Sequence, residues 1–233
     1  MSERIVMFRI VTITAFGLMC LGIGVHCVYV FLREPQGWRY VLHVIGGVVY
    51  RSIRVLSPKD SGFLSSLRGS VFLLASLSLV GLAGSGFIPV LGLNPSLSGY
   101  LLILHLMFAP VFLVSVALLA LMCTPYHSFV ENGGRSLHLI QQEGGTRARL
   151  ICAESDVCRR ICFWLIIVFT LPLGLSIVLG MSPFIGSLAQ TYLLEIHRYC
   201  ALTISLAAVM YIYLISASEA KRVSRDCVSR DKD

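Results

Sequence analysis

Residues 100–123 read YLLILHLMFAPVFLVSVALLALMC, a run without any charged side chain. At a rise of about 1.5 Å per residue, a helix of this length crosses the roughly 30 Å of hydrocarbon in a bilayer. Four other stretches are similarly apolar, so that the predicted membrane spans are residues 10–32, 70–91, 100–123, 161–181 and 192–216. The sequence therefore predicts an all-α integral membrane bundle of five transmembrane helices.

The composition of the whole chain favours the same fold class. Of its 233 residues, 56% are hydrophobic and 13% are charged, whereas soluble domains carry about 25% charged residues. Basic residues that flank membrane spans account for the net charge of +7, so we expect contact with a lipid bilayer and no nucleic-acid partner. Most of the eight cysteines lie in or beside apolar runs, where they are typical small buried hydrophobes.

The distribution of lysine and arginine predicts how the chain is oriented. These residues cluster in segments 33–69, 124–160 and 217–233, while the short loops 92–99 and 182–191 carry no charge. Basic connections remain on the cytoplasmic side of a membrane. We therefore expect a multi-pass protein of the inner (cytoplasmic) membrane, with its N-terminus outside and its C-terminus in the cytoplasm.

A short internal repeat places two histidines at equivalent depths. The motif Tyr100-Leu-Leu-x-x-His105 recurs as Tyr192-Leu-Leu-x-x-His197, displaced by 92 residues. Ionisable side chains inside a membrane are candidates for a functional role. Two imidazoles at one level of a bundle are able to provide both axial ligands of a b-type haem, so His105 and His197 are the predicted metal ligands.

Small and basic residues near the same depth have two interpretations each. Gly81, Gly84 and Gly86 leave room either for a flat macrocycle or simply for close helix packing. Arg198 is able to pair with a haem propionate, or to reach the interface beside Glu195.

The remaining histidines and a cysteine group give weaker indications. His127 and His138 are expected at or beyond the inner end of the third span, where water forms hydrogen bonds with their imidazole nitrogens. Three interpretations of His26 remain open: a haem ligand, a quinone contact or a lone polar residue. Cys152, Cys158 and Cys162 lack the CxxC spacing of common metal sites, and we do not assign them to one.

Four short motifs follow one another along the chain in a recognisable order. They are Ala83-Gly-Ser-Gly-Phe87, Leu104-His105 with a later Tyr126-His127, Cys162-Phe-Trp164, and Leu194-x-x-His197 followed by Tyr211 and Tyr213. Over about residues 66–216 this order resembles the cytochrome b561-like gamma subunits of membrane formate dehydrogenases and the related cytochromes of nickel-iron hydrogenases. Members of that family pass electrons from a partner subunit to a quinone through two haems.

The resemblance implies a specific set of ligands. The outer haem of the family corresponds to His105 and His197. Arg198, Gly84 and Gly86 are the further cofactor-binding residues that the sequence itself suggests at this depth. The positions of the two inner ligands read Ser70 and Tyr211, which are not usual ligands of haem b. The resemblance thus implies one haem b in this chain, and no second, inner haem.

The same resemblance divides the chain into three parts. Residues 70–216 correspond to the four-helix cytochrome b-like domain. Residues 1–69 add an N-terminal helix without counterpart in the family, and a basic amphipathic segment at 37–57 expected on the inner membrane surface. Residues 217–233 form a basic cytoplasmic tail.

The leading functional hypothesis is a membrane cytochrome b subunit that connects redox partner subunits to the quinone pool. The chain is then a non-catalytic electron-transfer subunit rather than an enzyme by itself, since the sequence supplies no paired nucleophile and base. One alternative is a haem-free membrane anchor or assembly subunit of a redox complex. A small transporter is another, because the hairpins repeat, although this repeat is parallel rather than inverted.

Overall fold

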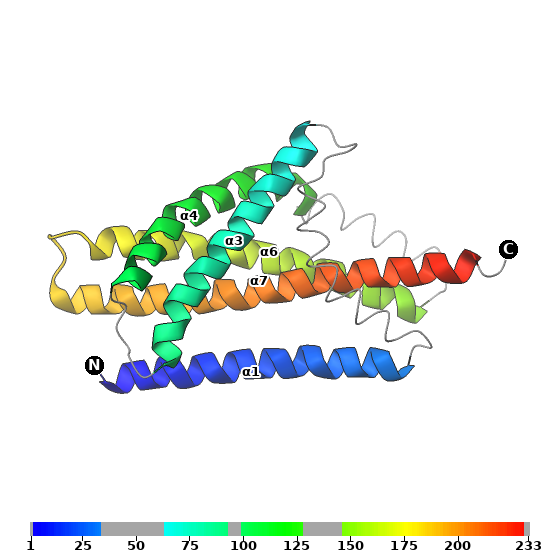
Figure 1. Cartoon of the computed structure of the whole chain (residues 1–233), viewed down its shortest axis with the longest axis horizontal. Coiled ribbons are helices and arrows are strands. Elements are labelled where there is room, and N and C mark those ends of the chain that lie inside the picture. The colour runs from blue at the N-terminus through cyan, green and yellow to red at the C-terminus, as the bar shows by residue number, and fades with distance from the viewer. Residues whose placement is uncertain (1, 34–62, 93–98, 128–145, 231–233) are drawn as a thin grey trace.

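The computed structural model describes residues 2–33, 63–92, 99–127 and 146–230. These residues form five helices and no strand, and each helix is long and apolar enough to cross a membrane. The helices are α1 (Ser2–Arg33), α3 (Phe63–Leu91), α4 (Tyr100–His127), α6 (Thr146–Gly180) and α7 (Ser187–Arg230), as Figure 1 shows. The prediction of an all-α membrane bundle is confirmed. The amphipathic segment expected at 37–57 and His138 lie outside the described residues.

The helices extend beyond the predicted spans. α6 begins well before residue 161, and α7 continues through residue 217 into the basic segment expected to be a tail. Hydropathy marks only the part of a helix that contacts lipid, while backbone hydrogen bonding continues wherever helix-forming residues follow. Gly99, which immediately precedes α4, has a φ of +59°, a left-handed conformation that favours glycine.

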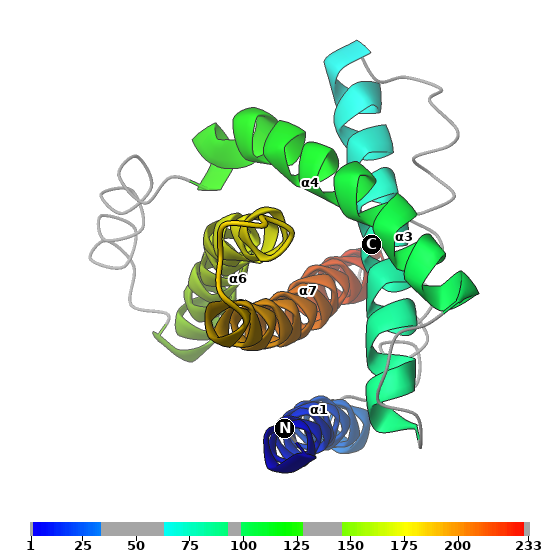
Figure 2. The ribbon, with the colours of Figure 1, turned by 90° about the vertical axis from the view of Figure 1, so that its left-hand side faces the viewer.

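The bundle consists of two hairpins and one additional helix. The most extensive helix contacts are between α6 and α7 and between α3 and α4. In Figure 1 the α3–α4 hairpin is inclined to the α6–α7 hairpin, and Figure 2 shows α1 beside α7 and the end of α3. The two copies of the internal repeat therefore begin the second helix of each hairpin.

The side chains are distributed as expected for a protein surrounded by lipid. Large apolar residues on all five helices are exposed, for example Leu18, Val80, Leu121 and Leu171, each at least 70%. Several buried polar residues are serines or threonines that donate hydrogen bonds to carbonyls of their own helix, as Thr12 does to Phe8. A soluble protein of this size exposes no such continuous apolar surface.

α1 is attached to the hairpins at one end of the bundle. Phe8 packs edge-to-face on Tyr199 of α7, with ring centroids 5.3 Å apart. Phe16 packs in the same manner on Phe87 of α3, at 5.7 Å. Close by, the Arg9 guanidinium donates a hydrogen bond to the carbonyl of Leu91, one of the last residues of α3. The first turns of α1 thus lie at the same end of the bundle as the end of α3 and the start of α7.

Candidate functional site

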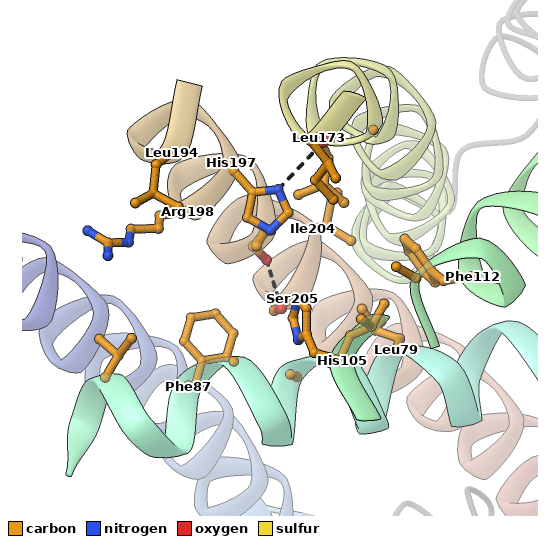
Figure 3. Close-up of a pocket in the computed structure, with 18 of the residues that line it drawn as sticks. Leu79, Phe87, His105, Phe112, Leu173, Leu194, His197, Arg198, Ile204 and Ser205 are labelled. Atoms are coloured by element: carbon orange, nitrogen blue, oxygen red, sulfur yellow. Dashed lines mark hydrogen bonds between the residues drawn. The ribbon is translucent and has the colours of Figure 1, made fainter. Parts of the chain in front are cut away.

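The two histidines of the internal repeat come together in the structure. The ring centroids of His105 on α4 and His197 on α7 are 6.3 Å apart, and the ring planes are inclined by 67°. Figure 3 shows both rings in the space between the hairpins. With metal–nitrogen bonds of about 2 Å, two imidazoles on opposite sides of one metal ion have centroids about 6 Å apart. The separation of the two ring centroids matches that of two ligands of one metal ion, and it is also an ordinary distance for an edge-to-face ring pair.

A serine on the preceding helix orients the imidazole of His105. Ser85 is buried, and its hydroxyl donates to the Gly81 carbonyl at 2.7 Å. The same oxygen lies 2.9 Å from Nδ1 of His105. A hydroxyl has only one hydrogen, so the contact between Ser85 and His105 is satisfied when Nδ1–H of the imidazole donates. In this tautomer the proton resides on Nδ1, and Nε2 carries a free lone pair.

The second hairpin repeats this arrangement around His197. Ser176 is buried, and its hydroxyl donates to the Leu173 carbonyl at 2.7 Å. Nδ1 of His197 lies 3.4 Å from this hydroxyl and 3.5 Å from the Leu173 carbonyl oxygen, the latter marked in Figure 3. Metal-binding histidines commonly donate their second nitrogen to such acceptors, which fixes the tautomer. These hydrogen bonds of the two imidazoles all involve Nδ1.

The two rings line a cavity of about 540 Å³. Ligand-binding sites typically occupy about 300–1,000 Å³. All five helices contribute to its walls, which are apolar apart from His105, His197, Arg198 and Ser205; the apolar walls include Phe8, Leu79, Phe87, Phe112, Leu173 and Ile204. Apolar walls and two nitrogen donors are the groups that a planar apolar ligand with a central metal ion requires.

The predicted glycines occupy different environments. Gly86 lines the cavity, and a Cβ atom on it would lie 3.4 Å from Cε1 of His105. Gly84 does not line the cavity, and a Cβ atom there would meet nothing within 4 Å. Gly81 packs so closely on Phe108 that a Cβ atom would lie 2.5 Å from the ring. Gly81 therefore serves helix packing, and of the three only Gly86 lines the cavity.

Arg198 lines the cavity but does not pair with Glu195, its expected interfacial partner. Glu195 instead forms an ion pair with Arg4 of α1, with 3.1 Å between Nη1 and Oε1. Figure 3 shows the Arg198 side chain directed toward α1, away from His197. No hydrogen bond or ion pair of Arg198 is found within the described part of the chain. Its charge remains available for an anionic group.

The other candidate ligands lie elsewhere. The Tyr213 hydroxyl contacts Nδ1 of His26, and their edge-to-face rings link α1 to α7 sixteen residues beyond His197. Within the described ranges, no group of three or more histidine, cysteine or acidic residues is arranged to hold a metal ion. Two imidazoles alone are too few ligands for a bare ion, but they suffice for a metal whose remaining ligands come from a macrocycle.

No family model, no curated protein and no solved structure matches this chain. The cavity and its two histidines are therefore the features of this chain that indicate a function.

Proposed function

We propose that this chain is a membrane cytochrome b subunit that binds one haem b through His105 and His197. The observation that carries the proposal is the pair of imidazoles 6.3 Å apart, each with Nδ1 engaged by its own hairpin. The Nε2 atoms are the iron ligands, and the apolar walls exclude water. Haem b supplies a one-electron carrier when bound.

The proposal extends to the cellular role of the chain. As a relative of the gamma subunits of formate dehydrogenases and nickel-iron hydrogenases, the chain transfers electrons between redox partner subunits and the quinone pool. It resides in the inner membrane with the haem close to the outer face, because the uncharged loops 92–99 and 182–191 belong to that side.

A haem-free membrane anchor or assembly subunit is the second candidate. One observation favours it: both Nδ1 atoms already have acceptors within the protein, so the bundle holds both imidazoles without a ligand. A reduced-minus-oxidised absorbance spectrum of the purified protein distinguishes the two candidates. The cytochrome shows the bands of a low-spin b-type haem, and the anchor shows none.

The haem content of the purified protein is expected to be one per chain. By the resemblance, Ser70 and Tyr211 occupy the positions of the two inner ligands. On the same side of the bundle, the imidazole of His26 contacts Tyr213. A pyridine haemochrome assay, normalised to protein by amino-acid analysis, measures the ratio. Two haems per chain would contradict this expectation and would direct attention to His26.

Labelling in intact cells tests the orientation. We expect a cysteine introduced at Gly186 to react with an impermeant maleimide added outside, and one at Ser229 to react only after the cells are opened. Gly186 is exposed, and a Cβ atom there meets nothing within 4 Å, so the substitution is tolerated. The unsubstituted chain controls for the native cysteines. Outside labelling of Ser229→Cys alone would reverse the proposed orientation.

A further inference from the structure

A second cavity, of about 360 Å³, adjoins the cavity of the two histidines. Ile5, Leu194 and Arg198 line both of them, so the two cavities are contiguous. The second cavity is more polar, because Arg4, Thr191 and Glu195 contribute to its walls. The combined space is apolar around the imidazoles and polar between the first turn of α1 and the start of α7.

The charges in the second cavity favour an anion. Arg4 and Arg198 carry two positive charges, and Glu195 is the one acidic residue among the lining residues. Arg4 is held in place by the ion pair with Glu195, and its guanidinium carbon lies 5.4 Å from the ring centroid of Tyr192. Arg198 is half-buried and has no partner within the described part of the chain. An unpaired, half-buried arginine at the end of a ligand cavity is a binding group for a carboxylate.

We propose that Arg4 and Arg198 together bind a carboxylate of the ligand that His105 and His197 hold by its metal. This inference rests on the proposed function and adds a role for α1, the helix outside the two hairpins. α1 provides Ile5 and Phe8 to the apolar wall and Arg4 to the anion site. A ligand that His105 and His197 would hold by its metal would therefore be an amphiphile, with an apolar body against the apolar walls and an acidic group that Arg4 and Arg198 would bind.

The test compares haem b with its dimethyl ester, in which both carboxylates are neutral. The full-length apoprotein in detergent is titrated with each compound, and the ratio of the two dissociation constants is determined for every variant. Charge-assisted hydrogen bonds to arginine favour the free acid by about tenfold. The two compounds partition unequally into detergent. This difference is the same for every variant, so it cancels when the ratios of the variants are compared.

Four variants are compared, and their expected ratios fall into three classes. Arg4→Gln and Arg198→Gln should each lower the preference for the free acid by about threefold to tenfold. Glu195→Gln should raise the preference, since it removes the negative charge that neutralises Arg4. Arg9→Gln is the matched control: Arg9 is also an arginine of the first turns of α1, but it donates to Leu91 and lines neither cavity. Its ratio should equal that of the unsubstituted chain.

The low-spin spectrum of each haem-bound variant reports that His105 and His197 still ligate the iron, and hence that the variant is folded. An unchanged ratio in both Arg4→Gln and Arg198→Gln, with that spectrum intact, would overturn the carboxylate site and leave the proposed function standing. Failure of the unsubstituted chain to bind either compound would overturn the proposed function and the carboxylate site with it.

Discussion

Replacement of His105 or His197 by alanine is expected to abolish the low-spin b-type spectrum completely. Axial ligation requires both imidazoles on one iron, and a single substitution leaves a five-coordinate or empty site. The double variant should therefore show no loss beyond that of either single variant. A hydrogen bond between membrane helices, by contrast, contributes only about 0.6–2 kcal/mol, and removing it would leave a bound cofactor in place.

Three other histidines serve as controls for this prediction. His26→Ala, His127→Ala and His138→Ala should retain the full spectrum. His26 is not among the described residues that line the cavity, and the sequence predicts His127 and His138 at or beyond the inner end of the third span. Difference spectra of membranes that contain equal amounts of each variant provide the measurement. If the unsubstituted chain shows the spectrum and His105→Ala or His197→Ala retains it intact, the ligand assignment is wrong and the anchor function replaces it.

Replacement of Gly86 by leucine is expected to lower haem affinity roughly 10- to 100-fold, since overpacking a filled site costs about 1–3 kcal/mol. A Cβ atom at this position lies 3.4 Å from Cε1 of His105, and the rest of a leucine side chain competes with the ligand for the cavity. Haem titration of the purified apoprotein measures the affinity, and thermal unfolding of the same samples reports the stability of the bundle.

Gly84→Leu is the matched control, two residues away on the same helix. A Cβ atom at Gly84 meets nothing within 4 Å, and the residue does not line the cavity. Its affinity for haem should equal that of the unsubstituted chain. If the two leucine variants lost the same haem affinity, α3 would accept no larger side chain at this depth on either face. The placement of the cavity beside Gly86 would then be wrong.

The two glycines also show why the sequence predicted the site only in part. Side chains two residues apart on a helix point to nearly opposite faces. The glycines near the end of α3 identified a region with small residues, but the sequence does not determine which face of α3 meets α4. The structure directs Gly86 toward His105, and Gly84, although predicted as a site residue, consequently lies outside the cavity.

The five spans and the pair of histidines, in contrast, could be predicted from the sequence. Apolar runs of sufficient length predict the five helices, and the repeat predicts His105 and His197 at one depth, because both depend on patterns within short segments. Ser85 and Ser176 were not predicted. Their signal is a serine 20 or 21 residues before each histidine, which becomes meaningful only when the hairpins are known. The pairing of Arg4 with Glu195 joins distant segments and leaves no local pattern.

The ion pair of Arg4 with Glu195 connects residues separated by 191 positions. During biosynthesis, α1 enters the membrane long before α7 is made, because translation proceeds at about 5–20 residues per second. His197 lies on α7, as do Glu195 and Arg198 of the proposed anion site. Neither site is complete until this last helix has been made. Insertion of the proposed haem would then follow synthesis of the final span. A chain interrupted before α7 lacks one of the two proposed metal ligands and one wall of the cavity.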